Sequence, residues 1–161
     1  MKRLKAEELE REALRGNSLF KAEVSGGTPV RAKLRQARLP GVYFKEVRFE
    51  FSDLTRAYLP QCRFGKCVLD DVKLEEAYLR GASFEECILK NCNLSSAVLC
   101  ETRFVRCQFY HCDFSLADFS LAVFVESRLA DCRVFLADFT QVDPAVLKAM
   151  AMDFKGAMLP V

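Results

Sequence analysis

The chain has 161 residues, about half of them apolar, and its 24 Lys and Arg nearly balance its 22 Asp and Glu. This length suits one domain, and the charge balance excludes both a broad basic nucleic-acid-binding patch and a strongly acidic, DNA-like surface. No stretch approaches the roughly 18 apolar residues of a membrane span. Because Glu7, Glu8 and Glu10 stand where a secretory signal needs its apolar core, we expect a cytoplasmic protein.

Residues 1–31 are predicted to cap the fold. Residues 2–15 are rich in helix formers and are followed by a glycine, so a helix is expected there. Leu19 and Val24 already fit the five-residue spacing described below, which places the start of an irregular first coil near Asn17. Residues 25–29, with two glycines and a proline, are predicted to interrupt this coil as a loop.

Residues 32–141 follow a strict five-residue repeat. Every fifth residue from Leu34 to Phe139 is Leu, Phe or, once, Val, and no insertion breaks the spacing. Two residues before each of them stands a small side chain, most often Ala or Cys. A period of five is neither the roughly 3.6-residue period of a helix nor the two-residue period of a strand. It predicts a coil that turns a corner every five residues and points one large and one small residue inward from each side.

Four such sides would close a square coil of about 20 residues, and stacked coils would bury a continuous core. The sequence supports this coil length, because like residues recur at intervals of 20. The recurring sets are Phe44, Phe64, Phe84, Phe104 and Phe124; Ala57, Ala77, Ala97, Ala117 and Ala137; Cys92, Cys112 and Cys132; and Cys67, Cys87 and Cys107.

Some repeats have the form known from one protein family. They are Ala117-Asp118-Phe119, Ala137-Asp138-Phe139 and Cys92-Asn93-Leu94. These segments resemble the A-(D/N)-L-x-x unit of the pentapeptide-repeat proteins, and the resemblance covers residues 32–141. It implies an all-β solenoid, a right-handed quadrilateral β-helix that rises about 4.8 Å per coil. Short helices are expected at its N- and C-terminal ends.

Residues 142–161 are predicted to form a helix and a tail. Asp143 suits a helix N-cap and is followed by proline at the first helical position, so a short helix is expected over residues 145–152. Phe154 and Leu159 return to the five-residue spacing. The tail is therefore expected to fold back onto the last coil.

Seven of the eight cysteines occupy the small inward position, and we interpret them as reduced packing residues. A zinc site would need four converging ligands, and disulfides are not expected in the cytoplasm. Cys100 alone lies at an outward position. His111 is the single histidine, and Asp113 and Ser115 near it would lie on a flat exposed side without a pocket. We therefore expect no catalytic residue, no metal and no cofactor.

The outward residues predict a protein-binding module rather than an enzyme. Tyr58 and Tyr78 are 20 residues apart and Val98 continues the series, so the three are expected to form a column on one side. Tyrosine is a frequent anchor of protein interfaces. Together with Arg80 and Glu101, this column is the predicted partner-binding surface. Proteins that the chain resembles occur beside bacterial toxins, which implies an antitoxin-like or immunity role.

Acidic residues on neighbouring sides allow two interpretations, a solvated surface or a docking site for a basic partner. They are Asp70, Asp71, Glu75, Glu76, Glu85 and Glu86. The resemblance also offers an alternative function, a DNA mimic that protects a type II topoisomerase as quinolone-resistance members do. Residues 32–141 carry 15 basic and 15 acidic side chains, which argues against mimicry. No small-molecule substrate, direct nucleic-acid contact or membrane contact is expected.

The last coils lose their polar outer surface, and the following helix is apolar on one face. The residues concerned are Leu116, Leu121, Val123, Val125, Phe135, Leu136, Leu147 and Met150. A contiguous exposed apolar patch usually marks a contact surface. Either the helix covers the patch within the chain, or patch and helix form the interface of a homodimer, as in the topoisomerase-binding members of the family.

Overall fold

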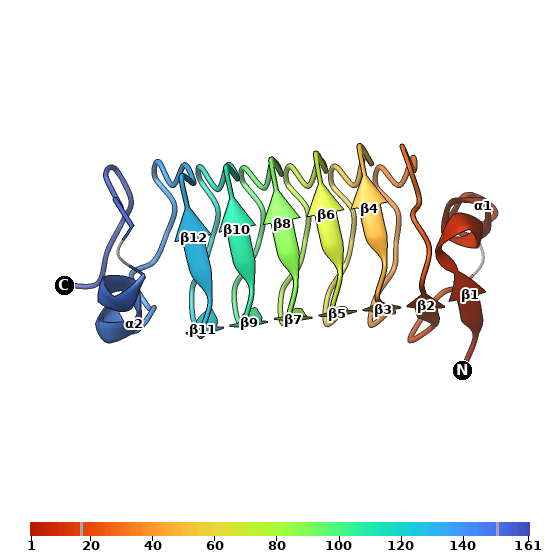
Figure 1. Ribbon diagram of the computed structural model, residues 1–161, viewed down its shortest axis with the longest axis horizontal. Coiled ribbons are helices and arrows are strands. Elements are labelled where there is room, and N and C mark those ends of the chain that lie inside the picture. The colour runs from red at the N-terminus through yellow and green to blue at the C-terminus, as the bar shows by residue number, and fades with distance from the viewer. Residues whose placement is uncertain (17, 151) are drawn as a thin grey trace.

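A computed structural model, which describes residues 1–16, 18–150 and 152–161, shows a parallel β-solenoid (Figure 1). Strands in adjacent coils pair residues that are 20 positions apart, such as Phe44 with Phe64 and Phe49 with Leu69. Four five-residue repeats therefore form each coil, and the chain folds as a right-handed quadrilateral β-helix. The predicted fold class is confirmed.

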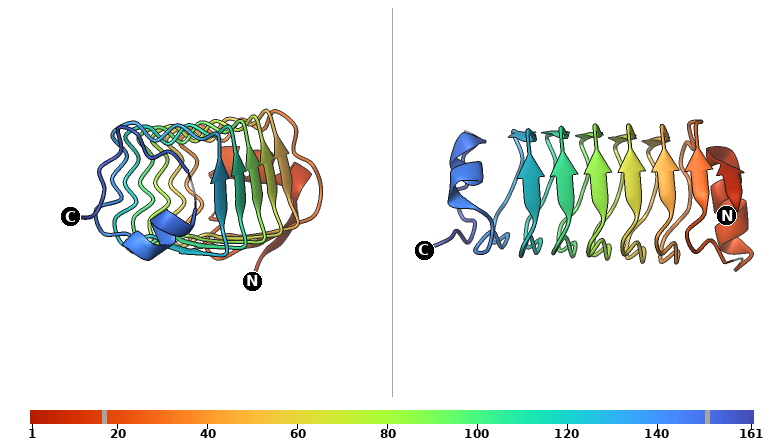
Figure 2. Two further views of the ribbon diagram at one scale, coloured as in Figure 1. Left: turned by 60° about the vertical axis from the view of Figure 1, so that its left-hand side comes forward. Right: turned by 90° about the horizontal axis from the view of Figure 1, so that it is seen from below.

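Two of the four sides are regular parallel sheets, and the right-hand view of Figure 2 shows the strands of one of them in a row. Side A contains β1 (Arg3–Lys5), β2 (Glu23–Ser25), β3 (Tyr43–Lys45), β5 (Arg63–Gly65), β7 (Ser83–Glu85), β9 (Arg103–Val105) and β11 (Val123–Val125), in that spatial order. Side B contains β4 (Arg48–Glu50), β6 (Val68–Asp70), β8 (Ile88–Lys90), β10 (Gln108–Tyr110) and β12 (Arg128–Ala130).

The other two sides pair through single backbone bridges. Side C consists of residues 52–56 and their equivalents in each coil, and side D consists of residues 57–61 and theirs. On side D, Tyr58 bridges Tyr78, and the Tyr58 N–H donates to the Ala37 carbonyl of the coil before at 2.8 Å. Backbone polar groups are thus satisfied between coils even where no strand is formed.

Each coil turns its corners with a residue in the left-handed conformation, for example Arg56 at φ 57° and Leu116 at φ 62°. An L-residue in this conformation costs roughly 1–2 kcal/mol. The corner N–H offsets part of that cost by bonding to the next coil, as the Leu116 N–H does to the Phe135 carbonyl at 2.9 Å. Within residues 32–141, the last corner of this kind is Leu136, at φ 55°. Gln141, five residues later, has no positive φ, so the regular repeat ends there.

The inward positions form a buried core that runs the length of the repeat. Polar groups at the small position bond to the backbone of the coil before, as the Cys62 thiol does to the Leu39 carbonyl at 2.9 Å. Thr102 makes the same contact with its hydroxyl to the Leu79 carbonyl at 3.1 Å. Six cysteines are buried, whereas Cys132 in the last coil and the outward-facing Cys100 are half-buried.

The N-terminal end differs from the prediction of one helix over residues 2–15. Its first residues form β1, which pairs with β2 in the solenoid register, and a 3-10 turn (Ala6–Glu8) and α1 (Leu9–Leu14) follow. Leu4, Leu9 and Leu14 keep the five-residue spacing, but the strand was missed because the residues between them are strong helix formers. The stacking on side A thus begins two coils before β3, the first side-A strand of the repeat tract.

Residues 25–29 form no strand beyond Ser25, as the predicted loop requires, but they keep the coil register, so the predicted interruption of the coil is wrong. The Glu50 N–H donates to the Pro29 carbonyl at 3.3 Å, and the next corner, Arg31, has the usual positive φ of 57°. Asn17, where we expect the first irregular coil to begin, lies outside the described residues.

The C-terminal helix α2 (Pro144–Ala149) begins as predicted, since the Asp143 carboxylate accepts from the Ala145 N–H at 2.8 Å. It lies at the end of the solenoid opposite α1 (Figure 1). The described helix is shorter than residues 145–152, and Ala151 lies outside the described residues.

The tail returns to the solenoid, as predicted. The Leu136 N–H donates to the Gly156 carbonyl at 2.7 Å, and the Met158 N–H donates to the Ala137 carbonyl at 2.9 Å. The last coil therefore has repeat-like backbone on sides C and D, and α2 stands in sequence where sides A and B would continue.

Candidate functional site

The predicted partner-binding residues lie together on side D. Backbone bridges join Tyr58 to Tyr78 and Tyr78 to Val98, so the three form a column along the solenoid. The two tyrosine rings are stacked, with centroids 5.3 Å apart and an interplanar angle of 16°. All three side chains are half-buried, which leaves part of each available to a partner.

Arg38 extends this column by one coil, and sequence analysis missed it. Its guanidinium lies over the Tyr58 ring, 4.6 Å from the centroid. Such a cation–π contact contributes about 0.5–1 kcal/mol at an exposed site. The 20-residue spacing from Tyr58 could have revealed it. In the other direction the column continues through Asp118 and Asp138, so it is basic at one end, aromatic in the middle and acidic at the other.

A shallow depression of about 350 Å³ opens beside the tyrosines. Its lining residues are Pro40, Tyr58, Pro60, Gln61, Tyr78, Arg80, Gly81 and Glu101. The Arg80 guanidinium donates to the Glu101 carboxylate at 2.7 Å, and this bond raises the pKa of Arg80. Four of the five predicted residues thus line one concave surface, and Val98 is the next residue in their column.

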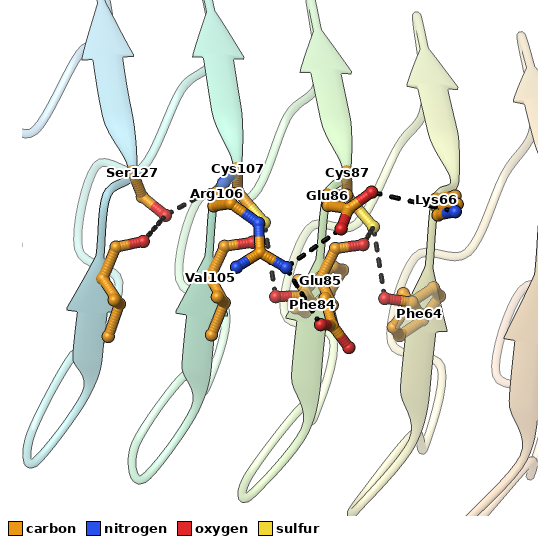
Figure 3. A network of polar contacts seen from close by, with 11 residues as sticks. Phe64, Lys66, Phe84, Glu85, Glu86, Cys87, Val105, Arg106, Cys107 and Ser127 are labelled. Atoms are coloured by element: carbon orange, nitrogen blue, oxygen red, sulfur yellow. Dashed lines mark hydrogen bonds and ion pairs between the residues drawn. The ribbon is translucent and has the colours of Figure 1, made fainter.

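The predicted acidic residues are spread over three corners of the coil and do not form one surface. Glu85 and Glu86 share the guanidinium of Arg106, at 3.2 and 2.9 Å, and Glu86 also lies 3.9 Å from the Lys66 ammonium (Figure 3). The charges along this corner alternate, because Lys66, Glu86, Arg106 and Glu126 follow one another at intervals of 20 residues. These carboxylates therefore link adjacent coils.

Side C uses its acidic residues in a similar way. The Arg56 guanidinium donates two bonds to Glu76, at 2.8 and 3.0 Å, and this pairing lowers the pKa of Glu76. Glu75 accepts a bond from the Asn93 side-chain amide. Of the six predicted residues, Asp70, Asp71 and Glu75 have no ion pair with the described residues.

The outward apolar residues of the last coils remain uncovered by α2. Five are exposed, Leu116, Leu121, Val123, Phe135 and Leu136, and Val125 is half-buried. Leu147 and Met150 instead belong to the buried core at the end of the solenoid, each 7% exposed. Their position supports helix docking against the last coil, and α2 closes the core without covering the patch.

The residues around His111 make structural contacts with neighbouring backbone and with an arginine of the next coil. Asp113 accepts from the Ser115 N–H at 2.9 Å and lies 3.5 Å from the Arg133 guanidinium, while His111 occupies an exposed corner with a positive φ of 52°. In the described ranges, no three His, Cys, Asp or Glu side chains are grouped as a metal site. None of the described helices has the length and apolar character needed to cross a bilayer.

Comparison with known proteins identifies a family and several solved structures to which the chain is similar. The family model for pentapeptide repeats matches eight copies, over residues 30–65, 67–104 and 102–141. A search of curated proteins found no match. Among solved structures, HetL from the cyanobacterium Nostoc sp. strain PCC 7120, a pentapeptide repeat protein involved in heterocyst differentiation regulation, is similar at a TM-score of 0.50. It is 22% identical, and the match covers 96% of this chain and 80% of HetL.

Two further solved structures match this chain at lower similarity. QnrB1, a plasmid-mediated fluoroquinolone resistance protein, is 19% identical with a TM-score of 0.33, over 98% of this chain and 88% of that one. A pentapeptide repeat protein from the Arabidopsis thaliana thylakoid lumen is 17% identical with a TM-score of 0.31, over 83% and 72% of the two chains. Because the family model for pentapeptide repeats matches more than half of the chain, the chain belongs to the pentapeptide-repeat family.

Proposed function

We propose that this chain is a non-enzymatic binding module that holds a partner protein on side D. The contact surface, called here the tyrosine surface, consists of Arg38, Tyr58, Tyr78, Val98, Arg80 and Glu101. The observation that carries the proposal is the stacked, half-buried tyrosine pair beside a depression of about 350 Å³. Tyrosine and arginine are the residue types that most often dominate binding energy at protein interfaces.

The scaffold holds this surface in place before binding. Tyr58 and Tyr78 sit on backbone that is bonded to the coils on both sides, and their rings restrict each other by stacking. Side chains that are already ordered lose little conformational entropy when a partner binds. The same residues on a mobile loop would lose more conformational entropy each time a partner bound.

DNA mimicry is not favoured as the mode of action. A mimic needs a regular array of carboxylates that are free to meet a basic protein, whereas Glu76, Glu85 and Glu86 are paired with arginines of neighbouring coils. The equal numbers of basic and acidic residues in the repeat also argue against DNA mimicry, because a mimic needs a net negative surface. A partner that engages the tyrosine surface, such as a toxin protein, fits the charge pattern better.

The test compares partner capture by three immobilised forms of the protein in extract from its source cells. They are the wild type, the double variant Tyr58→Ser and Tyr78→Ser, and the control Tyr110→Ser, which alters a half-buried tyrosine on side B. Quantitative mass spectrometry should find proteins retained by the wild type and the control and lost from the double variant. Equal retention by all three folded proteins would refute the proposal.

A further inference from the structure

We infer that a groove at the N-terminal end of the solenoid is a second binding site, which takes an extended acidic peptide segment of a partner protein. The groove has a volume of about 490 Å³ and lies between the α1 region and the first repeat coil. Leu14 and Phe20 line one wall, and Lys33, Arg35 and Arg38 line the other. Arg38 is the only one of these five that also belongs to the tyrosine surface.

The backbone ladder of the solenoid is open in this groove. In the next coil the carbonyl oxygens of Asp53 and Thr55 accept N–H bonds from the coil before, at 2.8 and 2.9 Å. The equivalent oxygens of Lys33 and Arg35 accept no such bond from any residue that the structure describes, because α1 replaces the regular backbone of the preceding coil. An open edge of this kind pairs readily with an added extended chain.

The groove also carries an excess of positive charge. Arg35 pairs with the Asp53 carboxylate at 3.9 Å, and Arg38 lies over the Tyr58 ring. Lys33 has no ion pair with the described residues, although its backbone N–H donates to the Glu10 carboxylate at 3.0 Å. That contact shows a carboxylate seated on this edge within the chain itself, and the three cations would attract more from a ligand.

The opposite wall specifies an apolar side chain in the ligand. Leu14 and Phe20 line the groove and are 71% and 61% exposed, and the Lys21 ammonium lies 5.1 Å from the centroid of the Phe20 ring. An aliphatic or aromatic residue placed between acidic ones would bury apolar surface there. A peptide is favoured over a nucleic acid because the open carbonyl oxygens need N–H donors, which a phosphodiester backbone lacks.

The probe is a fluorescein-labelled peptide of alternating acidic and leucine or phenylalanine residues, and binding is measured by fluorescence anisotropy. Two matched peptides isolate the two causes. One replaces every carboxylate by its amide, and the other is N-methylated at alternate positions, which removes the donors to the backbone edge. We expect each change to weaken binding at least about tenfold, and added salt to weaken binding of the parent peptide.

Variants of the protein locate the site. Lys33→Glu with Arg35→Glu should abolish binding, whereas Lys45→Glu with Lys90→Glu, on sides A and B, should leave it within about twofold. If the charge reversal prevents folding, Arg35→Gln provides a milder change that should still weaken binding. Tyr78→Ser, which leaves the Tyr58 ring under Arg38, should leave binding within about twofold, which separates this site from the tyrosine surface.

Three results would overturn the inference. They are equal binding of the acidic and amide peptides, undiminished binding of the N-methylated peptide, and an effect of the Lys33 and Arg35 changes no larger than that of the control pair. Tighter binding of a single-stranded oligonucleotide that the acidic peptide cannot displace would also overturn it.

Discussion

Phe64 and Phe84 lie face to face, with ring centroids 4.4 Å apart and planes that differ by 1°. They are two steps in a column that runs from Phe44 to Phe124, one ring per coil, with centroid separations of 4.4 to 5.2 Å. The coil rise and the stacking distance of aromatic rings are nearly equal, so the column fits the solenoid without changes in backbone geometry. The column therefore adds to the cohesion between coils that the backbone hydrogen bonds provide.

Replacing Phe84 with Ala should lower the free energy of unfolding by about 3–5 kcal/mol, because it leaves a cavity between two rings that cannot close together. The matched control is Phe51→Ala, since Phe51 is 57% exposed at a corner and its loss should cost no more than about 0.5 kcal/mol. Urea titrations followed by circular dichroism measure both. Similar midpoints for the two variants would mean that the ring column does not hold the coils together.

Leu116→Gly should stabilise the protein by about 0.5–1 kcal/mol. Leu116 has a φ of 62° and an exposed side chain, so glycine relieves the strain at little loss of buried surface. Ser115→Gly is the control, because Ser115 has no positive φ and glycine there only adds freedom to the unfolded chain. Thermal unfolding should move in opposite directions for the two variants. A shift in the same direction would contradict the strain at the corner.

Stability should decline above about pH 9 in part through Cys62. Burial raises the pKa of this thiol to about 12. The folded state therefore favours the neutral thiol, and this contribution is complete below the unfolded pKa near 9 and is lost as the pH rises towards 12. The loss amounts to about 1.4 kcal/mol per pH unit.

The variant Cys62→Ala isolates this effect, since alanine occupies the equivalent positions 82 and 122. The free energy of unfolding of both proteins is measured at about pH 8 and about pH 10. All other titratable groups are the same in the two proteins, so a difference between their pH-dependent losses is due to Cys62. We expect the wild type to lose more stability than the variant over that interval. Parallel losses would show that the thiol ionises as easily in the folded protein as in the unfolded chain.

Leu147→Asp should open the C-terminal end of the core while the repeat stays folded. Leu147 is buried there, and Met150 lines a depression together with the half-buried Cys132. Native thiol labelling of Cys132 should accelerate by an order of magnitude or more, because a charged residue cannot stay in the core. Lys148→Asp changes an exposed neighbour on the same helix and should leave the rate near that of the wild type. An unchanged rate in the Leu147 variant would refute the capping role of α2.

The repeat tract could be predicted almost completely from sequence, because each coil restates the same rule. One large and one small inward residue recur every five positions. A polar residue at an inward position, such as Ser52 or Thr102, is therefore assigned correctly from the other residues of its column. The same redundancy identified Tyr58 and Tyr78 as neighbours. Arg38 was overlooked because the column was followed only through apolar and aromatic side chains, although its spacing is the same.

The ends were harder to predict because they have no redundancy. At the N-terminal end, Leu4, Leu9 and Leu14 keep the five-residue spacing, but the helical composition around them outweighed that signal and β1 was missed. The open edge at Lys33 and Arg35 depends on where α1 leaves the coil, which no local pattern encodes. In the same way, the burial of Leu147 and Met150 follows from how α2 docks on the last coil, and an apolar helix face alone fits several arrangements.

Site-specific photocrosslinking tests the central claim, partner binding at the tyrosine surface, most directly. A photoreactive phenylalanine derivative replaces Tyr78 in one form of the protein and Tyr110, on side B, in another, and both are irradiated in the source cells. The account predicts a discrete crosslinked partner at position 78 that is absent at position 110 and is lost when Tyr58 is changed to Ser in the same chain. Crosslinks of equal yield at both positions, or at position 110 alone, would contradict it.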